Sequence, residues 1–282
     1  MATATATRAE LRLRAAREIG DGLEVLTTAA GNTGGTTLID TLNLMQPNDA
    51  LIGAQIVSIS SGAHQGEVRY ISDNAQSTGT VTVAAAFTGQ VAAARVFHVF
   101  NLRDIGVPVN DMNGFLDEAI DAVRDTALVE VLSSALAFDR ASPVITLSNA
   151  TLGGAFTDGT LWGILGVAWQ DSSDIWHETD DFRVDKASRT IELRGRGRDY
   201  ANGRNIRIRG CSQPSLLTSD TSTTGIDPIY IVKYAAARAL FSISGRLGPE
   251  KQALAKYMDM KDTAERRKLA VRTRFVPGPI KL

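Results

Sequence analysis

The sequences Glu67-Val-Arg-Tyr-Ile71 and Thr80-Val-Thr-Val83 decide the fold of the first third of the chain, together with Ala54-Gln-Ile-Val-Ser-Ile59 before them. In these runs, polar and apolar residues alternate or β-branched residues predominate, and glycines lie between the runs. Successive side chains of a β-strand point to opposite faces, so a period of two predicts strands with one buried side. Residues 23–103 are therefore predicted to form a small antiparallel barrel or sandwich.

The segment before this module, residues 1–22, has a helical pattern. Thr7 and Glu10 form a capping-box sequence, and Gly20 supplies a C-terminal stop. The side opposite the apolar stripe bears four arginines, Arg8, Arg12, Arg14 and Arg17. They form either a basic arm for a partner protein or nucleic-acid backbone, or a solvated helix face, and the second is favoured.

A second helix is predicted from Asn110 to about Ala137, with a broad apolar stripe. Its other side is acidic and includes Asp117, Glu118, Asp121 and Asp125. Such a helix could line a passage that repels DNA, so that a duplex slides without sticking. The alternative is an ordinary amphipathic helix packed on a sheet, and the sequence leaves both open.

Residues from about Pro143 to Gln213 form a second β-rich stretch, in which Asp185-Lys-Ala-Ser188 is predicted to be a hairpin turn. This stretch carries a cluster of arginines, Arg194, Arg196, Arg198, Arg204, Arg207 and Arg209. Single-stranded nucleic acid would need aromatic side chains for base stacking, and Tyr200 alone accompanies the cluster. An interfacial or solvated arginine face is therefore favoured over nucleic-acid recognition.

The last third of the chain returns to a helical pattern. Asp227 and Pro228 begin an Ala-rich helix that ends at Gly245, and a helix with a basic end is predicted from Pro249 to Ala270. Residues 104–270 are grouped as one core of helices and the second β-rich stretch. The predicted class is α+β.

Residues 271–282 are predicted to form an extended C-terminal arm, because Pro277 and Pro279 forbid a helix. The residues assigned to docking are Arg272, Arg274, Phe275, Val276, Pro277, Pro279, Ile280 and Leu282. An arm with apolar side chains at intervals docks either on its own domain or in a neighbour's groove, and the neighbour is favoured.

Charge is segregated along the chain, although the formal net charge is only −1. Residues 101–180 carry 3 basic and 13 acidic side chains, whereas residues 233–282 carry 12 and 4. This polarity suits contact with other macromolecules at both ends of the molecule, unless folding mixes the charges on one surface. The start of the chain has no apolar segment of a secretory signal, and Val81–Phe100 is too often interrupted by polar residues to span a membrane.

The sequence contains no recognisable catalytic motif. His64, His98 and His177 lie in different segments without metal-ligand spacing, and the single Cys211 excludes a thiolate zinc site or an internal disulfide. We therefore expect no enzymatic activity, cofactor or metal. Tryptophans recur every seven residues, at Trp162, Trp169 and Trp176, which indicates either core packing or sugar stacking, with core packing favoured.

Several stretches resemble a β module of tailed-bacteriophage virion proteins. They are Gly35-Thr-Thr-Leu-Ile-Asp40, Leu51-Ile-Gly53, Gly66-Glu-Val-Arg-Tyr-Ile71 and Gly79-Thr-Val-Thr-Val83. The later half resembles head-to-tail connector adaptors in its order of elements. A helix is followed by strands around a tryptophan, then by Ile226-Asp-Pro-Ile-Tyr230 at the start of an Ala-rich helix, a basic helix and a terminal arm. The resemblance is one of pattern and order over most of the chain.

The resemblance implies a structural virion protein, a neck adaptor present as a ring of typically twelve copies. Such a ring joins the portal to the tail, lets double-stranded DNA pass, and is assembled in the cytoplasm of the bacterial host. The implied partners are the portal protein, further copies of the chain, and tail or neck proteins such as a stopper, terminator or nozzle. The C-terminal segment commonly inserts into the portal in such adaptors, which here is Ala270 to Leu282.

This sequence departs from many adaptors in the size of its β module, which is either decoration or a binding site for another neck or fibre protein. Two other functions stay open on the sequence. One is a carbohydrate- or receptor-binding tail fibre or baseplate protein that uses Trp162 and Trp169. The other is a glycoside hydrolase, for which no site is evident.

Overall fold

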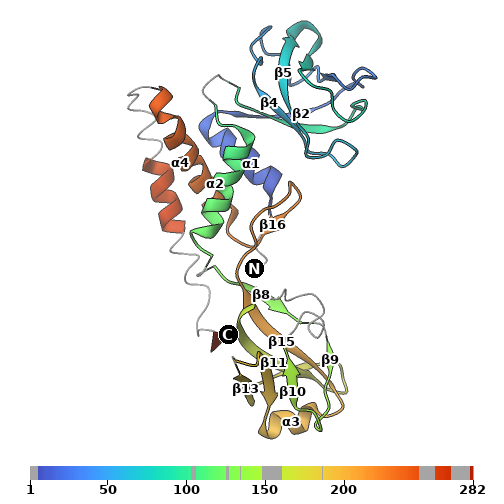
Figure 1. Ribbon diagram of the computed structural model, residues 1–282, viewed down its shortest axis with the longest axis vertical. Coiled ribbons are helices and arrows are strands. Elements are labelled where there is room, and N and C mark those ends of the chain that lie inside the picture. The colour runs from blue at the N-terminus through green and yellow to red at the C-terminus, as the bar shows by residue number, and fades with distance from the viewer. Residues whose placement is uncertain are drawn as a thin grey trace. The chain divides into compact units, whose positions relative to one another are not determined.

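The computed structural model describes residues 6–102, 106–124, 127–133, 135–147, 161–185, 187–247, 258–267 and 280–281. The chain divides into two compact units. Unit 1 comprises residues 1–122 and 215–270, and unit 2 comprises residues 123–214 and 271–282 (Figure 1). Residues 104–270, which we predicted to form one core, are divided between the two units. The predicted α+β class is confirmed.

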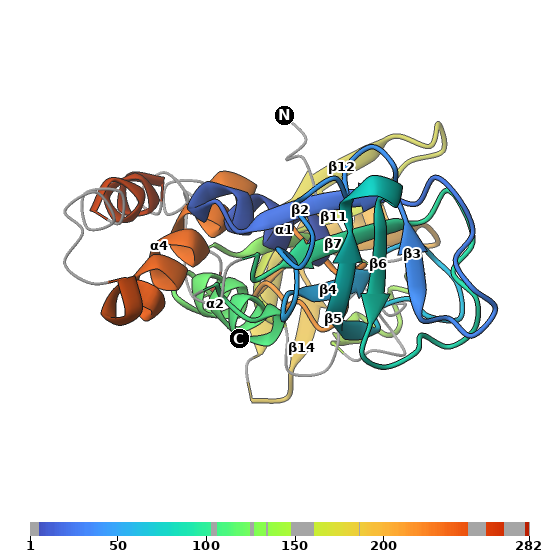
Figure 2. The same cartoon turned by 90° about the horizontal axis from the view of Figure 1, so that it is seen from above.

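Unit 1 contains a six-stranded antiparallel sheet in the order β2-β7-β4-β5-β6-β3 (Figure 2). Its strands are β2 (Gly22–Leu26), β3 (Thr37–Ile39), β4 (Gln55–Ser58), β5 (Val68–Ala75), β6 (Thr80–Val83) and β7 (Val96–Phe100). The sheet curls into a half-barrel, so the β-rich character predicted for residues 23–103 is confirmed. It is one curled sheet, not two facing ones.

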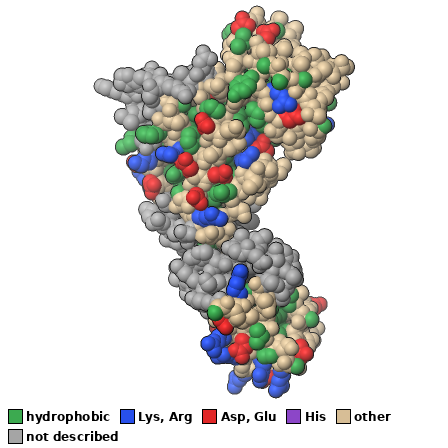
Figure 3. Space-filling model, in the orientation of Figure 1, with side chains coloured by type: hydrophobic (Ala, Val, Ile, Leu, Met, Phe, Trp, Pro, Cys, Tyr) green, Lys and Arg blue, Asp and Glu red, His purple; other side chains and the backbone are tan. Residues whose placement is uncertain are grey.

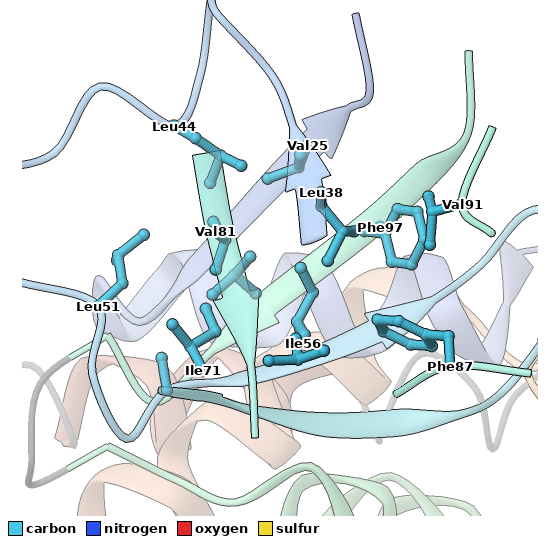
Figure 4. Close-up of a cluster of buried hydrophobic side chains, with 13 residues drawn as sticks. Val25, Leu38, Leu44, Leu51, Ile56, Ile71, Val81, Phe87, Val91 and Phe97 are labelled. Atoms are coloured by element: carbon cyan, nitrogen blue, oxygen red, sulfur yellow. The ribbon is translucent and has the colours of Figure 1, made fainter. Parts of the chain in front are cut away.

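The core of this sheet follows from the period of two. In β6, Val81 and Val83 are buried, while Thr80 and Thr82, which alternate with them, are partly exposed. Figure 4 shows Val81 with Val25, Ile56 and Phe97, which reach the same apolar interior from β2, β4 and β7. The alternation in β6 fixes its register, because a slip by one residue would turn Val81 and Val83 toward solvent.

The β5–β6 connection depends on a glycine. A short 3-10 helix, η1 (Gln76–Thr78), leads to Gly79 with φ +56°. A Cβ at this position would lie 2.3 Å from the carbonyl oxygen of Asp40, so only glycine fits without a shift of the backbone.

The carboxylate of Asp40, which is 0% exposed, organises the loop after β3. Its Oδ2 accepts from the backbone N–H of Leu26 at 3.0 Å and from the amide of Asn43 at 2.8 Å, and its Oδ1 accepts from the N–H of Leu42 at 2.9 Å. Burial alone would raise the pKa of Asp40, but the hydrogen bonds from Asn43, Leu42 and Leu26 lower it overall.

We predict that Asp40→Ala lowers the free energy of unfolding by about 2 kcal/mol, because several part-buried N–H donors lose their acceptor. Chemical denaturation of the full chain measures this difference. Asp73→Ala is the matched control, since Asp73 is exposed on β5 of the same sheet. Equal effects of the two substitutions would contradict the prediction.

The helices of unit 1 are α1 (Arg8–Ile19), α2 (Val109–Asp121) and α4 (Pro228–Leu247), and residues 258–267 are also helical. The predicted capping box of α1 is confirmed, with Gly20 in the left-handed conformation at its end. Asp227 accepts from the N–H of Ile229 at 3.0 Å and so caps α4 as predicted, although α4 extends two residues past Gly245. The predicted start of the last helix at Pro249 lies outside the described residues.

The predicted extent of the second helix is wrong. α2 ends at Asp121, and Val129–Leu132 form strand β8 instead of a continuation to Ala137. β8 pairs with β15 through Ser212↔Val129 and Arg209↔Leu132. The β-branched residues at 129 and 131 favour a strand, and this pairing overrides the helical spacing of the apolar residues.

Unit 2 contains two antiparallel sheets. The larger sheet consists of β8, β9 (Leu136–Ala137), β11 (Leu161–Gln170), β12 (Trp176–Thr179), β15 (Asn205–Ser212) and β17 (Ile280–Lys281). The smaller consists of β10 (Val144–Thr146), β13 (Phe182–Asp185) and β14 (Thr190–Leu193). A short helix, α3 (Gly195–Ala201), was not predicted. The remaining elements of the chain are β1 (Ala6–Thr7) and β16 (Thr223–Thr224), which pair with each other in unit 1.

Candidate functional site

Two of the four arginines predicted on a basic or solvated face of α1 are engaged inside unit 1. Arg12 is 1% exposed, and its two terminal nitrogens contact the two carboxylate oxygens of Asp220 at 2.8 and 3.0 Å. Arg12 also donates to Asn113 of α2 at 3.0 Å. Arg8 donates to Asp220 at 3.3 Å and to the carbonyl oxygen of Leu217 at 2.6 Å. Arg8 and Arg12 therefore hold the fold together, and the prediction of a free arginine face is wrong for them.

A sequence signal for the burial of Arg12 existed. The helix carries apolar residues on most of its circumference, with Ala9, Leu11, Leu13 and Ala15 all buried. A helix that is apolar on most sides is a buried one, so an arginine within it needs a partner. The identity of that partner could not be predicted, because Asp220 is 208 residues away.

The other two arginines, Arg14 and Arg17, are exposed and line a groove between α1 and the first turns of α4. We call this the basic groove. It has a volume of about 520 Å³ and is lined by Arg14, Arg17, Glu18, Ile229, Val232 and Lys233. Lys233 pairs with Glu18 at 2.9 Å. The lining thus combines an excess of positive charge with apolar side chains, which suits a protein partner that presents both acids and apolar groups.

The predicted acidic residues of the second helix have different environments. Asp117 accepts from the backbone N–H of Leu217 at 3.0 Å, and Glu118 pairs with Arg238 of α4 at 2.8 Å. Asp121 is exposed at the end of α2. Asp125 lies outside the described residues. Asp117 and Glu118 thus contact the chain itself, as in an ordinary amphipathic helix, and a DNA-lining role stays a prediction.

Acidic side chains nevertheless share the exposed side of α2. Asp111, Glu118 and Asp121 are exposed at spacings of seven and three residues, so they lie on one side of the helix. The half-buried ring of Phe115 belongs to the same side. We call these four residues the acidic face of α2. Figure 3 shows acidic, basic and hydrophobic side chains together over the region of α2 and α4.

The predicted interfacial arginines lie in unit 2, where Figure 3 shows basic side chains gathered near α3. Arg194 pairs with Glu192 at 2.7 Å, and Arg198 lies 3.8 Å from Asp199. On β15, Arg209 pairs with Glu178 of β12. The guanidinium of Arg207 stacks 4.3 Å from the ring centre of Trp176. Arg196 is exposed. An interfacial role for these arginines stays a prediction.

Trp169 of β11 belongs to a packed cluster. Its ring lies 4.6 Å from His177 and 5.8 Å from Tyr200 in stacked arrangements, and 4.9 Å from the guanidinium carbon of Arg204. Trp169 also packs against the core of unit 2. Three side chains thus already contact the indole that a sugar would stack on. The side chain of Trp162 lies outside the described residues.

His177 pairs with Asp171 at 2.8 Å across the β11–β12 turn. Its carboxylate partner is therefore not Asp180 or Asp181, the neighbours in sequence. The hydrogen bond from His177 lowers the pKa of Asp171. In the part of the chain that the structure describes, three or more His, Cys, Asp or Glu side chains are nowhere arranged to hold a metal ion. None of the described helices is long and apolar enough to cross a membrane.

The C-terminal arm is described only at its end. Ile280 and Lys281 form β17, which pairs with β11 through Ile164↔Ile280 and Gly163↔Lys281. The arm therefore ends on the chain's own unit 2, although the sequence favoured a neighbour's groove. The other residues assigned to docking lie outside the described residues; they are Arg272, Arg274, Phe275, Val276, Pro277, Pro279 and Leu282.

Comparison with known proteins does not assign the chain to a family. No protein-family model matches the chain, and no curated protein matches it. The function is therefore argued from the surfaces described above.

Proposed function

We propose that this protein is a structural component of a tailed-bacteriophage virion, a neck adaptor without enzymatic activity. Its copies form a ring that joins the portal to the tail and lets double-stranded DNA pass. The order of the helix α2, the strands around Trp169, the Ala-rich helix α4 and the helix at 258–267 supports this proposal. The same order of elements underlies the resemblance to connector adaptors.

The observation that carries the proposal is the pairing of β17 with β11. β17 adds one short strand beside β11, and among the described residues two pairs join the two strands. Addition of an extended segment to a sheet edge uses backbone hydrogen bonds, which most strands can provide. A ladder of this length contributes little stability. The arm can therefore leave β11 during assembly and pair with a strand of the portal.

We predict that removal of residues 271–282 abolishes attachment to portal-bearing capsids. The melting temperature is expected to change little, because two residue pairs contribute only a small part of the stability of unit 2. Co-sedimentation with tailless capsids measures attachment, and calorimetry measures melting.

The control for this truncation keeps the length of the arm. A chain in which residues 271–282 are replaced by twelve Gly and Ser residues is also expected to stay unattached. Attachment of the truncated chain would refute docking through the arm. Attachment of the Gly/Ser chain alone would show that its side chains are dispensable.

Location in the virion tests the function as a whole. We expect cryo-electron microscopy of the tail vertex to show density for a ring of this chain between portal and tail. Density at the distal tip or on fibres would instead support the receptor-binding alternative. The contacts already made by the indole of Trp169 speak against this residue as a sugar platform.

A further inference from the structure

The basic groove of unit 1 is accessible and has a definite chemical character. Glu18 is paired with Lys233, so the exposed Arg14 and Arg17 provide its excess charge. Ile229, an apolar residue 46% exposed, lines the same groove from the first turn of α4. A large exposed apolar side chain beside two cations favours an occupant that brings both carboxylates and apolar groups.

Charge distinguishes between two segments of the chain that could occupy the basic groove, the C-terminal arm and the acidic face of α2. The C-terminal arm carries Arg272 and Arg274, which the groove would repel. On the acidic face of α2, Glu118 is paired with Arg238, so Asp111 and Asp121 beside Phe115 provide the charge that is complementary to the groove. Among these surfaces, the acidic face of α2 is therefore the better occupant.

The two surfaces belong to different helices of the same unit, and both are exposed in the single chain. Their contact must therefore join different copies. A contact between two unlike surfaces is heterologous, and its repetition generates a closed ring or a filament, in contrast to the paired contact of a two-fold dimer.

We propose that the basic groove of one copy receives the acidic face of α2 of the next copy. This inference rests on the proposed ring function and specifies its subunit contact. Arg14 and Arg17 face the carboxylates of Asp111 and Asp121 across the interface, and Phe115 packs beside Ile229.

Reciprocal charge reversal tests the contact in the full chain. The R14E/R17E variant presents an acidic groove and an acidic face, whereas the D111K/D121K variant presents a basic groove and a basic face. Each variant alone is expected to self-associate at least about 100-fold more weakly than the wild type, because like charges meet at the contact. An equimolar mixture is expected to recover association, because each groove then meets a face of opposite charge. Sedimentation velocity over a concentration series measures both effects.

The R140E/R183E variant is the matched control, since it changes the net charge by the same amount at two exposed positions of unit 2 outside the predicted interfacial arginines. Its self-association is expected to equal that of the wild type. Equal weakening of this control would overturn the assignment, because association would then depend on net charge. Failure of the mixture to recover association would also overturn it.

Two outcomes separate this inference from the proposed function. The contact is refuted if wild-type chains stay monomeric at every soluble concentration, or if R14E/R17E self-associates as the wild type does. The proposed function survives that result, because microscopy of the virion can still show a ring. If R14E/R17E associates normally but no longer attaches to portal-bearing capsids, the groove binds the portal and not a second copy.

Discussion

Replacement of Arg12 by alanine is expected to lower the free energy of unfolding of unit 1 by about 4 kcal/mol. Removal of the guanidinium leaves the carboxylate of Asp220 in a largely buried site without its bidentate partner. Burial would raise the pKa of Asp220, but the hydrogen bonds and charge of Arg12 and Arg8 lower it overall. The pair thus depends on the ionised form of Asp220. Denaturant titration of the full chain measures the loss.

The neighbouring Arg14→Ala is the matched control, because Arg14 is an exposed arginine of the same helix. It is expected to change stability by less than about 0.5 kcal/mol. A double variant, Arg12→Met with Asp220→Leu, is expected to recover much of the stability, since it removes both buried charges. A loss below about 1 kcal/mol for Arg12→Ala would contradict the structural role assigned to the pair.

Stability of unit 1 is expected to fall between pH 6.5 and pH 4 because of His98. Burial, followed by the nearby charge of Arg12, lowers the pKa of His98 from 6.5 to about 4. The unfolded chain therefore binds a proton in this window that the folded chain does not bind, so the free energy of unfolding decreases as the pH falls. The size of this effect is about 3 kcal/mol across the window.

Denaturation at a series of pH values tests this dependence. The His98→Gln variant is expected to show a flatter profile between pH 6.5 and 4, whereas His177→Gln serves as a control because His177 is an exposed histidine. The lowered pKa values of Asp40 and Asp220 add a further loss of stability only below about pH 4, where carboxylates titrate. An unchanged slope in His98→Gln would show that this residue is not the titrating group.

The sequence was sufficient to predict elements that depend on neighbouring residues. The capping box at Thr7, the alternation in Thr80-Val-Thr-Val83 and the cap at Asp227 each involve residues within a few positions, and the structure confirms them. The end of α2 could not be predicted in this way, because Val129–Leu132 become a strand by pairing with residues 209–212. The helix α3 was missed because its two glycines have a low helix propensity.

The candidate surfaces were predicted only in part, for the same reason. The exposure of Arg14 and the burial of Arg12 differ although both residues lie on one short helix. The difference arises from the partners of Arg12, which are Asp220, Asn113 and the ring of Phe100, all distant from it in the sequence. The strand formed by Ile280 and Lys281 likewise depends on a partner more than 100 residues away.

The division of the chain has a consequence for biosynthesis. Unit 1 is completed only by residues 215–270, and residues 123–214 of unit 2 are encoded between its two parts. On the ribosome, the half-barrel sheet can fold once residues 22–100 have emerged, because all its strands lie within that span. The surfaces of α1 and α2 that pack on Asp220 and α4 must instead wait, and they are exposed while residues 123–247 are translated. A chaperone that shields these two helices would act in that interval.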